Sequence, residues 1–130
     1  MAGQAGMVRV LVIDDDDLVR DTLGFMVESA GHSAIIAKSA EEGLLAMETG
    51  PADIVVTDMF MPDRNGIEFI SELRRRFPQT RIIAISGGGQ AGDVEILEAA
   101  QNAGATAVLQ KPFGPEELDE TIAHVLSAQA

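Results

Sequence analysis

The length of 130 residues predicts a single domain, and the absence of cysteine excludes a disulfide framework, a thiolate zinc site and a thiol nucleophile. A net charge of −12 and a pI near 4.3 argue against direct binding to nucleic acid or to anionic membranes. The apolar runs are too short to span a bilayer and the first residues lack a signal-peptide pattern, so we expect a cytoplasmic protein.

Short β-branched segments alternate with amphipathic segments along the chain. The first β-branched segment, VRVLVI at 8–13, is nearly all apolar, as expected of a strand covered on both faces. Segments with helix signals follow the strands, and in several of them the apolar residues recur at helical spacing. The expected strands are 8–13, 32–37, 54–57, 81–85 and 106–110, and the expected helices are 17–30, 40–49, 65–77, 94–103 and a last helix from 115 onward.

Local signals mark the ends of several expected helices. Gly31 suits the position after a helix C-terminus, and Ser39 and Glu42 have the spacing of a capping box. Asp93 is a candidate N-cap, and Pro115 suits the first position of the last helix. These signals support the division of the chain into five strand–helix pairs.

The alternation of strands and helices predicts the α/β fold class. Right-handed connections between parallel strands give a doubly wound five-stranded parallel sheet with helices on both faces. The strand order 2-1-3-4-5, that of flavodoxin-like folds, is the expected topology. We expect residues 1–7 to form a disordered leader and residues 8–127 to form the domain.

Polar residues follow four of the expected strands. Asp58 comes directly after the third strand, where an unpaired buried acid is costly. The predicted topology brings Asp14, Asp15, Ser86 and Lys111 to the same edge of the sheet. Three carboxylates this close repel one another unless a cation is present. Mg²⁺ prefers oxygen ligands, so the set fits a magnesium-assisted phosphoryl transfer.

Four motifs at the ends of expected strands give the chain a specific resemblance. They are VLVIDDDDLVR, VVTDMFMPDRNG, IIAISG and VLQKPF, in this order. Together they resemble the response-regulator receiver domain of two-component signalling, in particular the single-domain chemotaxis-regulator type. The resemblance spans essentially residues 8–126 and implies the flavodoxin-like receiver fold.

The resemblance implies a phospho-acceptor that binds Mg²⁺. Asp58 is the implied nucleophile, which takes a phosphoryl group from a phosphohistidine donor. Asp15, Asp58 and the backbone carbonyl of Phe60 are the implied direct Mg²⁺ ligands, and Asp14 is implied to act through a water molecule. The implied chemistry is limited to self-phosphotransfer and slow autodephosphorylation, without turnover of an external substrate.

Two side chains complete the implied site. Lys111 is implied to hold the acyl phosphate, and Ser86 is implied to hydrogen-bond it. Pro112 is implied to follow a cis peptide bond, which costs an X-Pro bond only about 0.5–1 kcal/mol. Without the resemblance, the plain interpretation of Ser86 is a turn residue before glycines, and that of Lys111 is a solvated lysine at a strand end.

The acids also have a plainer interpretation as helix caps. Asp58 can cap the helix expected at 65–77, and Asp14 or Asp15 can cap the helix at 17–30, although Asp16 or Asp17 suits that role better. The remaining residues are expected to have only structural roles or no role in chemistry. Pro62 and Gly66 are turn formers, Met26 and Met47 are core residues, and Arg74, Arg75 and Arg76 are solvated near a helix C-terminus. His32 and His124 are assigned no chemistry.

Three features bear on how the chain differs from the family pattern. Val108 stands three residues before the lysine, where the family often has a Tyr or Phe that acts as a rotating switch. The glycine-rich loop SGGGQAGD at 86–93 is longer than usual, and we expect it to become ordered when Ser86 engages the phosphoryl group. Phe60 and Gly88 occupy the positions that tune phosphoryl lifetime. Neither side chain can orient a water molecule, which predicts slow dephosphorylation.

The leading hypothesis is a response regulator in a phosphorelay. Its expected partners are a sensor histidine kinase or a histidine phosphotransfer protein and an unidentified downstream protein, and it acts as a monomer or a phosphorylation-dependent dimer. The alternatives are a pseudo-receiver that takes up no phosphoryl group and a receiver fragment of a larger multidomain regulator. A flavodoxin-like cofactor binder is disfavoured because four acids follow the first strand, and a DxDxT phosphatase because that motif is absent.

Overall fold

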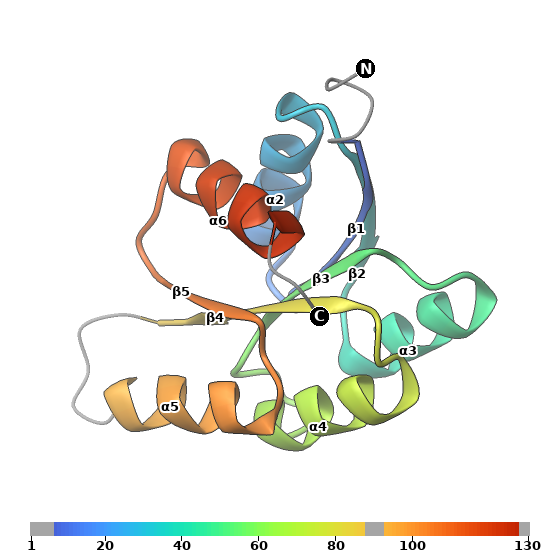
Figure 1. Ribbon diagram of the computed structural model, residues 1–130, viewed down its shortest axis with the longest axis vertical. Helices are drawn as coiled ribbons and strands as arrows, with labels where there is room; N and C mark the ends of the chain where they lie inside the picture. Colours follow the sequence, from blue (N-terminus) through green and yellow to red (C-terminus); the bar gives the residue numbers. More distant parts are fainter. Residues whose placement is uncertain (1–6, 88–92, 128–130) are drawn as a thin grey trace.

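The computed structural model describes residues 7–87 and 93–127, and these residues have the predicted doubly wound fold. Five parallel strands form one sheet in the order β2-β1-β3-β4-β5. Helices α2 and α6 cover one face and α3, α4 and α5 cover the other (Figure 1). The strands are β1 (Arg9–Ile13), β2 (Ser33–Ala37), β3 (Ile54–Asp58), β4 (Arg81–Ser86) and β5 (Ala107–Gln110), and the helices are α2 (Asp17–Ser29), α3 (Ala40–Thr49), α4 (Gly66–Arg76), α5 (Asp93–Ala103) and α6 (Pro115–Ser127).

The register of the parallel strands sets where each strand ends. At the end of β1, Ile13 is paired with Ala37 on one side and with Thr57 on the other. Asp58 is itself the last residue of β3 and is paired with Ile85. The prediction placed Asp58 just after this strand, and the structure extends the strand by one residue to include it. The acids therefore emerge next to one another from neighbouring strands.

Two apolar cores, one on each face of the sheet, hold the helices in place. Met47 and Phe69 are fully buried in the core beneath α3, α4 and α5. On the other face, Leu23 and Ile122 are buried beneath α2 and α6, and Met26 is partly buried against the same core. Full burial of such a side chain contributes about 1.5–3 kcal/mol. The predicted core position of Met47 is confirmed, and Met26 packs against the other core as predicted although it is only partly buried.

Helix ends follow the predicted signals with one difference. Asp16 caps α2, and Gly31 has a φ of +94°, a conformation that favours glycine. Ser39 caps α3 as predicted. The carboxylate of Glu42, however, accepts the amide of Lys38 at 2.9 Å, so this bond of the expected capping box is displaced by one residue.

Two residues have roles other than those predicted. Arg74 is not simply solvated, because its guanidinium donates hydrogen bonds to the carbonyl of Gly104, just beyond α5. The last carbonyls of a helix lack partners within it, and Arg74 supplies donors near this end. Gly66 begins α4, and a Cβ there would lie 2.4 Å from the carbonyl oxygen of Met59. The close approach of the Met59 backbone, more than the formation of a turn, explains why this position holds a glycine.

Several predictions concern residues outside the described part of the chain. The leader up to residue 6, Gly88 and most of the loop at 86–93 lie there, as does the side chain of the candidate cap Asp93. Their predicted properties stay predictions, and so do the domain bounds. Within residues 7–87 and 93–127, none of the helices has the length and apolar character that a membrane crossing requires.

Candidate functional site

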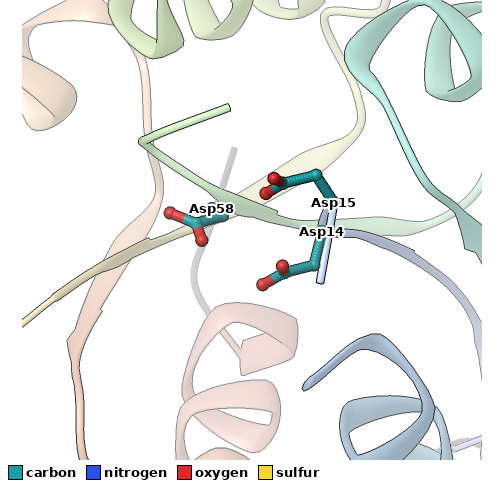
Figure 2. A group of neighbouring side chains, drawn as sticks. All are labelled: Asp14, Asp15 and Asp58. Carbon is teal, nitrogen blue, oxygen red and sulfur yellow. The ribbon is translucent and has the colours of Figure 1, made fainter. Parts of the chain in front are cut away.

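The carboxyl edge of the sheet brings the five candidate side chains to one region. Asp14 and Asp15 follow β1, Asp58 ends β3, Ser86 ends β4 and Lys111 follows β5. Figure 2 shows the three aspartates projecting from the ends of neighbouring strands. One carboxylate oxygen from each lies within 4.8 Å of those of the other two. The expected proximity is therefore present for the three aspartates, and the ammonium of Lys111 lies within 4.0 Å of two of them.

Asp58 is a buried carboxylate whose two oxygens have different surroundings. Its Oδ1 accepts the backbone amide of Phe60 at 2.9 Å, and its Oδ2 lies 3.4 Å from the Nζ of Lys111. The N-cap of α4 is Asn65, whose side chain accepts two amides of the first turn. Asp58 is thus not the helix cap that the plainer interpretation proposed.

Asp14 is almost completely buried, with 1% of its surface exposed. Its Oδ1 accepts the amide of Asp16 at 2.9 Å, while its Oδ2 has no hydrogen-bond partner among the described residues and lies 4.0 Å from Lys111. Burial raises the pKa of the Asp14 carboxyl, and the neighbouring Asp58 raises it further. A buried carboxylate oxygen without a partner is costly, so this oxygen is suited to an additional ligand.

The aspartate cluster fits a hard divalent cation. Asp15 is exposed, so the cluster is open to solvent on its side, and Lys111 places one positive charge next to the carboxylates of Asp14 and Asp58. Mg²⁺ prefers oxygen ligands and retains several water molecules, which a half-open group of carboxylates permits. The unpartnered oxygen of Asp14 is the observation of this structure that supports the fit.

Ser86 and Lys111 complete the edge through the ends of β4 and β5. The amide of Lys111 donates to the carbonyl of Ser86 at 2.9 Å, which ties the two strand ends together. Ser86 is fully buried, and its hydroxyl donates to the carbonyl of Gly87 at 3.1 Å. The peptide bond between Lys111 and Pro112 is cis, as predicted. Lys111 is not free in solvent, because its ammonium group faces the carboxylate of Asp58.

One structural feature next to the site is not predicted from the sequence, namely the contact that holds the loop between β3 and α4 on α3. The carboxylate of Asp63 accepts the amides of Ala40 and Glu41 at the N-terminus of α3. Asp63 lies 23 and 22 residues from these partners in sequence. No local pattern signals this contact, because its partners are backbone amides that any residue at those positions would supply.

Comparison with known proteins places the chain among signalling proteins. The family model for the response regulator receiver domain matches residues 10–123. The KDP operon transcriptional regulatory protein KdpE of Escherichia coli is 35% identical over 112 residues, which are 86% of this chain and 48% of KdpE. The sensor kinase CckA of Brucella abortus is 33% identical over 127 residues, 96% of this chain and 13% of CckA. The chain thus spans about half of KdpE and a small part of CckA.

Solved structures with the same fold agree with this placement. A response regulator receiver domain protein from Clostridium thermocellum is 29% identical with a TM-score of 0.83, covering 91% of this chain and 93% of its own. The chemotaxis response regulator CheY4 of Vibrio cholerae is 28% identical with a TM-score of 0.81, covering 92% of this chain and 98% of its own. The doubly wound sheet of these neighbours is the one described above.

Proposed function

This chain belongs to the response regulator receiver domain family, and on that premise we propose that Asp58 accepts a phosphoryl group from a phosphohistidine donor. The donor is a sensor histidine kinase or a histidine phosphotransfer protein. The observation that carries the proposal is the position of Asp58, a buried carboxylate with one oxygen facing Lys111 and two further aspartates beside it. The bond to the donor nitrogen breaks as an oxygen of Asp58 bonds to phosphorus, and the imidazole leaves with the electron pair.

The chain's own residues suit the charge changes of this transfer. Lys111 lies where its ammonium group neutralises charge on a phosphoryl oxygen at Asp58, and the hydroxyl of Ser86 is the proposed second donor to that group. Asp14, Asp15, Asp58 and the Phe60 carbonyl are the proposed residues that hold Mg²⁺. When bound, Mg²⁺ supplies positive charge that offsets carboxylate repulsion and the charge of the transferring group.

Uptake of a phosphoryl group from acetyl phosphate tests the proposal. Wild type, Asp58→Asn and Asp53→Asn are incubated with Mg²⁺ and acetyl phosphate, and intact masses are compared. Asp53 is the matched control, because it is an acid just before β3, at the opposite end of that strand, where its carboxylate accepts the amide of Arg9. We expect one added phosphoryl group on wild type and on Asp53→Asn, and none on Asp58→Asn.

The same experiment separates the alternative functions. A pseudo-receiver that serves only as an interaction module takes up no phosphoryl group in wild type. An added group that persists in Asp58→Asn contradicts Asp58 as the acceptor. Because the chain spans about half of KdpE, output through a downstream protein or through a further domain stays part of the proposal. The cytoplasmic location and a monomer or phosphorylation-dependent dimer are proposals as well.

The lifetime of the phosphorylated form follows from Phe60. Its side chain is more than half exposed and carries no group that can hydrogen-bond an attacking water molecule. We therefore propose slow self-dephosphorylation, which a time course of the intact mass after removal of acetyl phosphate measures. An aspartyl-phosphate half-life of seconds at neutral pH contradicts it.

A further inference from the structure

The loop between β3 and α4, residues 59–65, is held on α3 through Asp63. Its carboxylate accepts the amides of Ala40 at 3.3 Å and Glu41 at 3.2 Å, the first two residues of α3. Ser39 accepts the next amide, that of Glu42, at 3.1 Å. The N-terminus of α3 therefore has two caps, one from its own segment and one from a loop that follows the phospho-acceptor strand.

The same loop is also fastened at its two ends. Phe60 and Asn65 form an antiparallel bridge that closes the loop on itself, and the amide of Phe60 donates to Asp58. Asn65 caps α4, and Gly66 lies close against the backbone of Met59. These contacts set the shape of the loop, while Asp63 sets where its tip lies relative to the rest of the molecule.

The segment that receives Asp63 also holds Asp14. The carbonyl of Ala37, the last residue of β2, accepts the amide of Asp14 at 3.2 Å. Ala40 and Glu41, only a few residues further on, hold Asp63. The junction between β2 and α3 is therefore a common support for Asp14 on one side and for the loop that carries Phe60 on the other.

We propose that Asp63 is a positioning residue for Mg²⁺ binding. It holds the loop of residues 59–65 on the N-terminus of α3, so that the Phe60 carbonyl and the Asp14 carboxylate keep fixed positions relative to each other. The proposal rests on the proposed function, because it concerns the same metal site. Arg64 supports it, because its guanidinium pairs with Glu41 of α3 and with Glu72 of α4 on either side of the loop. Groups that orient metal ligands typically change metal affinity by about 10–100-fold when they are removed.

Calorimetric titration with Mg²⁺ of wild type, Asp63→Ala, Asp63→Asn and Ser39→Ala tests the proposal. Ser39→Ala is the matched control, because it removes a cap of the same helix without touching the loop. We expect Asp63→Ala to weaken Mg²⁺ binding about tenfold and Ser39→Ala to change it by less than about threefold. Asp63→Asn, which retains one acceptor oxygen, should give an intermediate affinity. Thermal unfolding without Mg²⁺ should show that both alanine variants lose stability.

A second measurement follows the rate of phosphorylation by acetyl phosphate as Mg²⁺ is varied. Asp63→Ala should need about tenfold more Mg²⁺ for its half-maximal rate, while its rate at saturating Mg²⁺ stays near that of wild type. Equal Mg²⁺ affinities for Asp63→Ala and Ser39→Ala overturn the proposal, because the role of Asp63 is then only to stabilise α3. If Asp63→Ala does not fold, Asp63→Asn decides, and an affinity equal to that of wild type overturns it.

The two proposals fail in different ways. A wild-type protein that neither binds Mg²⁺ nor takes up a phosphoryl group contradicts the proposed function. A wild type that does both, together with an Asp63→Ala variant that matches Ser39→Ala, contradicts only the role of Asp63.

Discussion

Two groups of acidic side chains in this molecule differ in burial and in their ion-pair partners. At the carboxyl edge of the sheet, three aspartates cluster and Lys111 pairs with two of them, while an oxygen of the buried Asp14 has no hydrogen-bond partner among the described residues. Between α3 and α4, Arg64 and Arg76 pair with three glutamates. Those glutamates are more exposed than Asp14 and Asp58, yet they have the better partners.

If only the stability of the fold mattered, the buried aspartates and not the exposed glutamates would have the better ion-pair partners. Exposed ion pairs contribute little, whereas buried charges without partners are costly. An unfavourable arrangement of buried charges at the ends of neighbouring strands is typical of a functional site. The difference between the two groups supports the proposal that the aspartate group is the reactive one, and changes to each group should have effects of different size and sign.

The largest expected effect is the loss of Mg²⁺ stabilisation in Asp15→Asn. A ligand at 100 times its Kd stabilises a protein by about 2.7 kcal/mol. Removal of one carboxylate should weaken Mg²⁺ binding at least tenfold, so that the stabilisation at the same concentration falls to about 1.4 kcal/mol or less. Chemical denaturation with and without Mg²⁺ measures both values. Asp17→Asn, an exposed acid two residues further on, is the control and should respond to Mg²⁺ as wild type does.

The next effect has the opposite sign. Without Mg²⁺, Asp14→Asn should be more stable than wild type by about 1 kcal/mol, because a buried charge without a full set of partners is removed. The amide oxygen of asparagine can still accept the amide of Asp16. Urea denaturation in the presence of a chelator measures the difference. A variant less stable than wild type under these conditions would show that the aspartate group is not under charge repulsion.

The smallest effect concerns the paired glutamates. Hydrogen bonding to Arg64, with a further contribution from Arg76, lowers the pKa of Glu72. The stabilisation from this pair is therefore complete above the ordinary glutamate pKa and is lost as pH falls through the lower folded-state pKa. Glu72→Gln should cost about 0.5–1 kcal/mol at neutral pH and nothing in strong acid. A difference between wild type and variant that persists unchanged in acid contradicts the pairing.

Sequence patterns were sufficient for the features that depend on local chemistry and chain order. Strand and helix alternation predicted the sheet order, and the polar residues at strand ends predicted the grouping of Asp14, Asp15 and Asp58. The cis bond at Pro112 followed from the family resemblance. These predictions succeeded because parallel strands with right-handed connections leave few alternative topologies.

Contacts between distant segments were not predictable in the same way. Asp63, Arg74 and Gly66 owe their roles to backbone groups in another segment, namely the amides of α3, the carbonyl of Gly104 and the backbone of Met59. Nearly every residue has the same backbone groups, so the sequence does not indicate which of them an acid or a glycine will contact. Only the packed arrangement of loops and helices identifies the partner.

The place of each strand in the sheet has a consequence for how the site opens. Asp14 follows β1 and Asp58 ends β3, and both of these strands have a strand on either side. Lys111 follows β5, which is hydrogen-bonded to β4 alone among the described strands. Local opening and amide exchange occur most readily where fewest backbone bonds must break. We therefore expect the strand before Lys111 to separate from the sheet more readily than β1 and β3 do. Fraying of β5 would move Lys111 away from Asp14 and Asp58, so we expect the charge balance of the site to depend on the opening and closing of its edge strand.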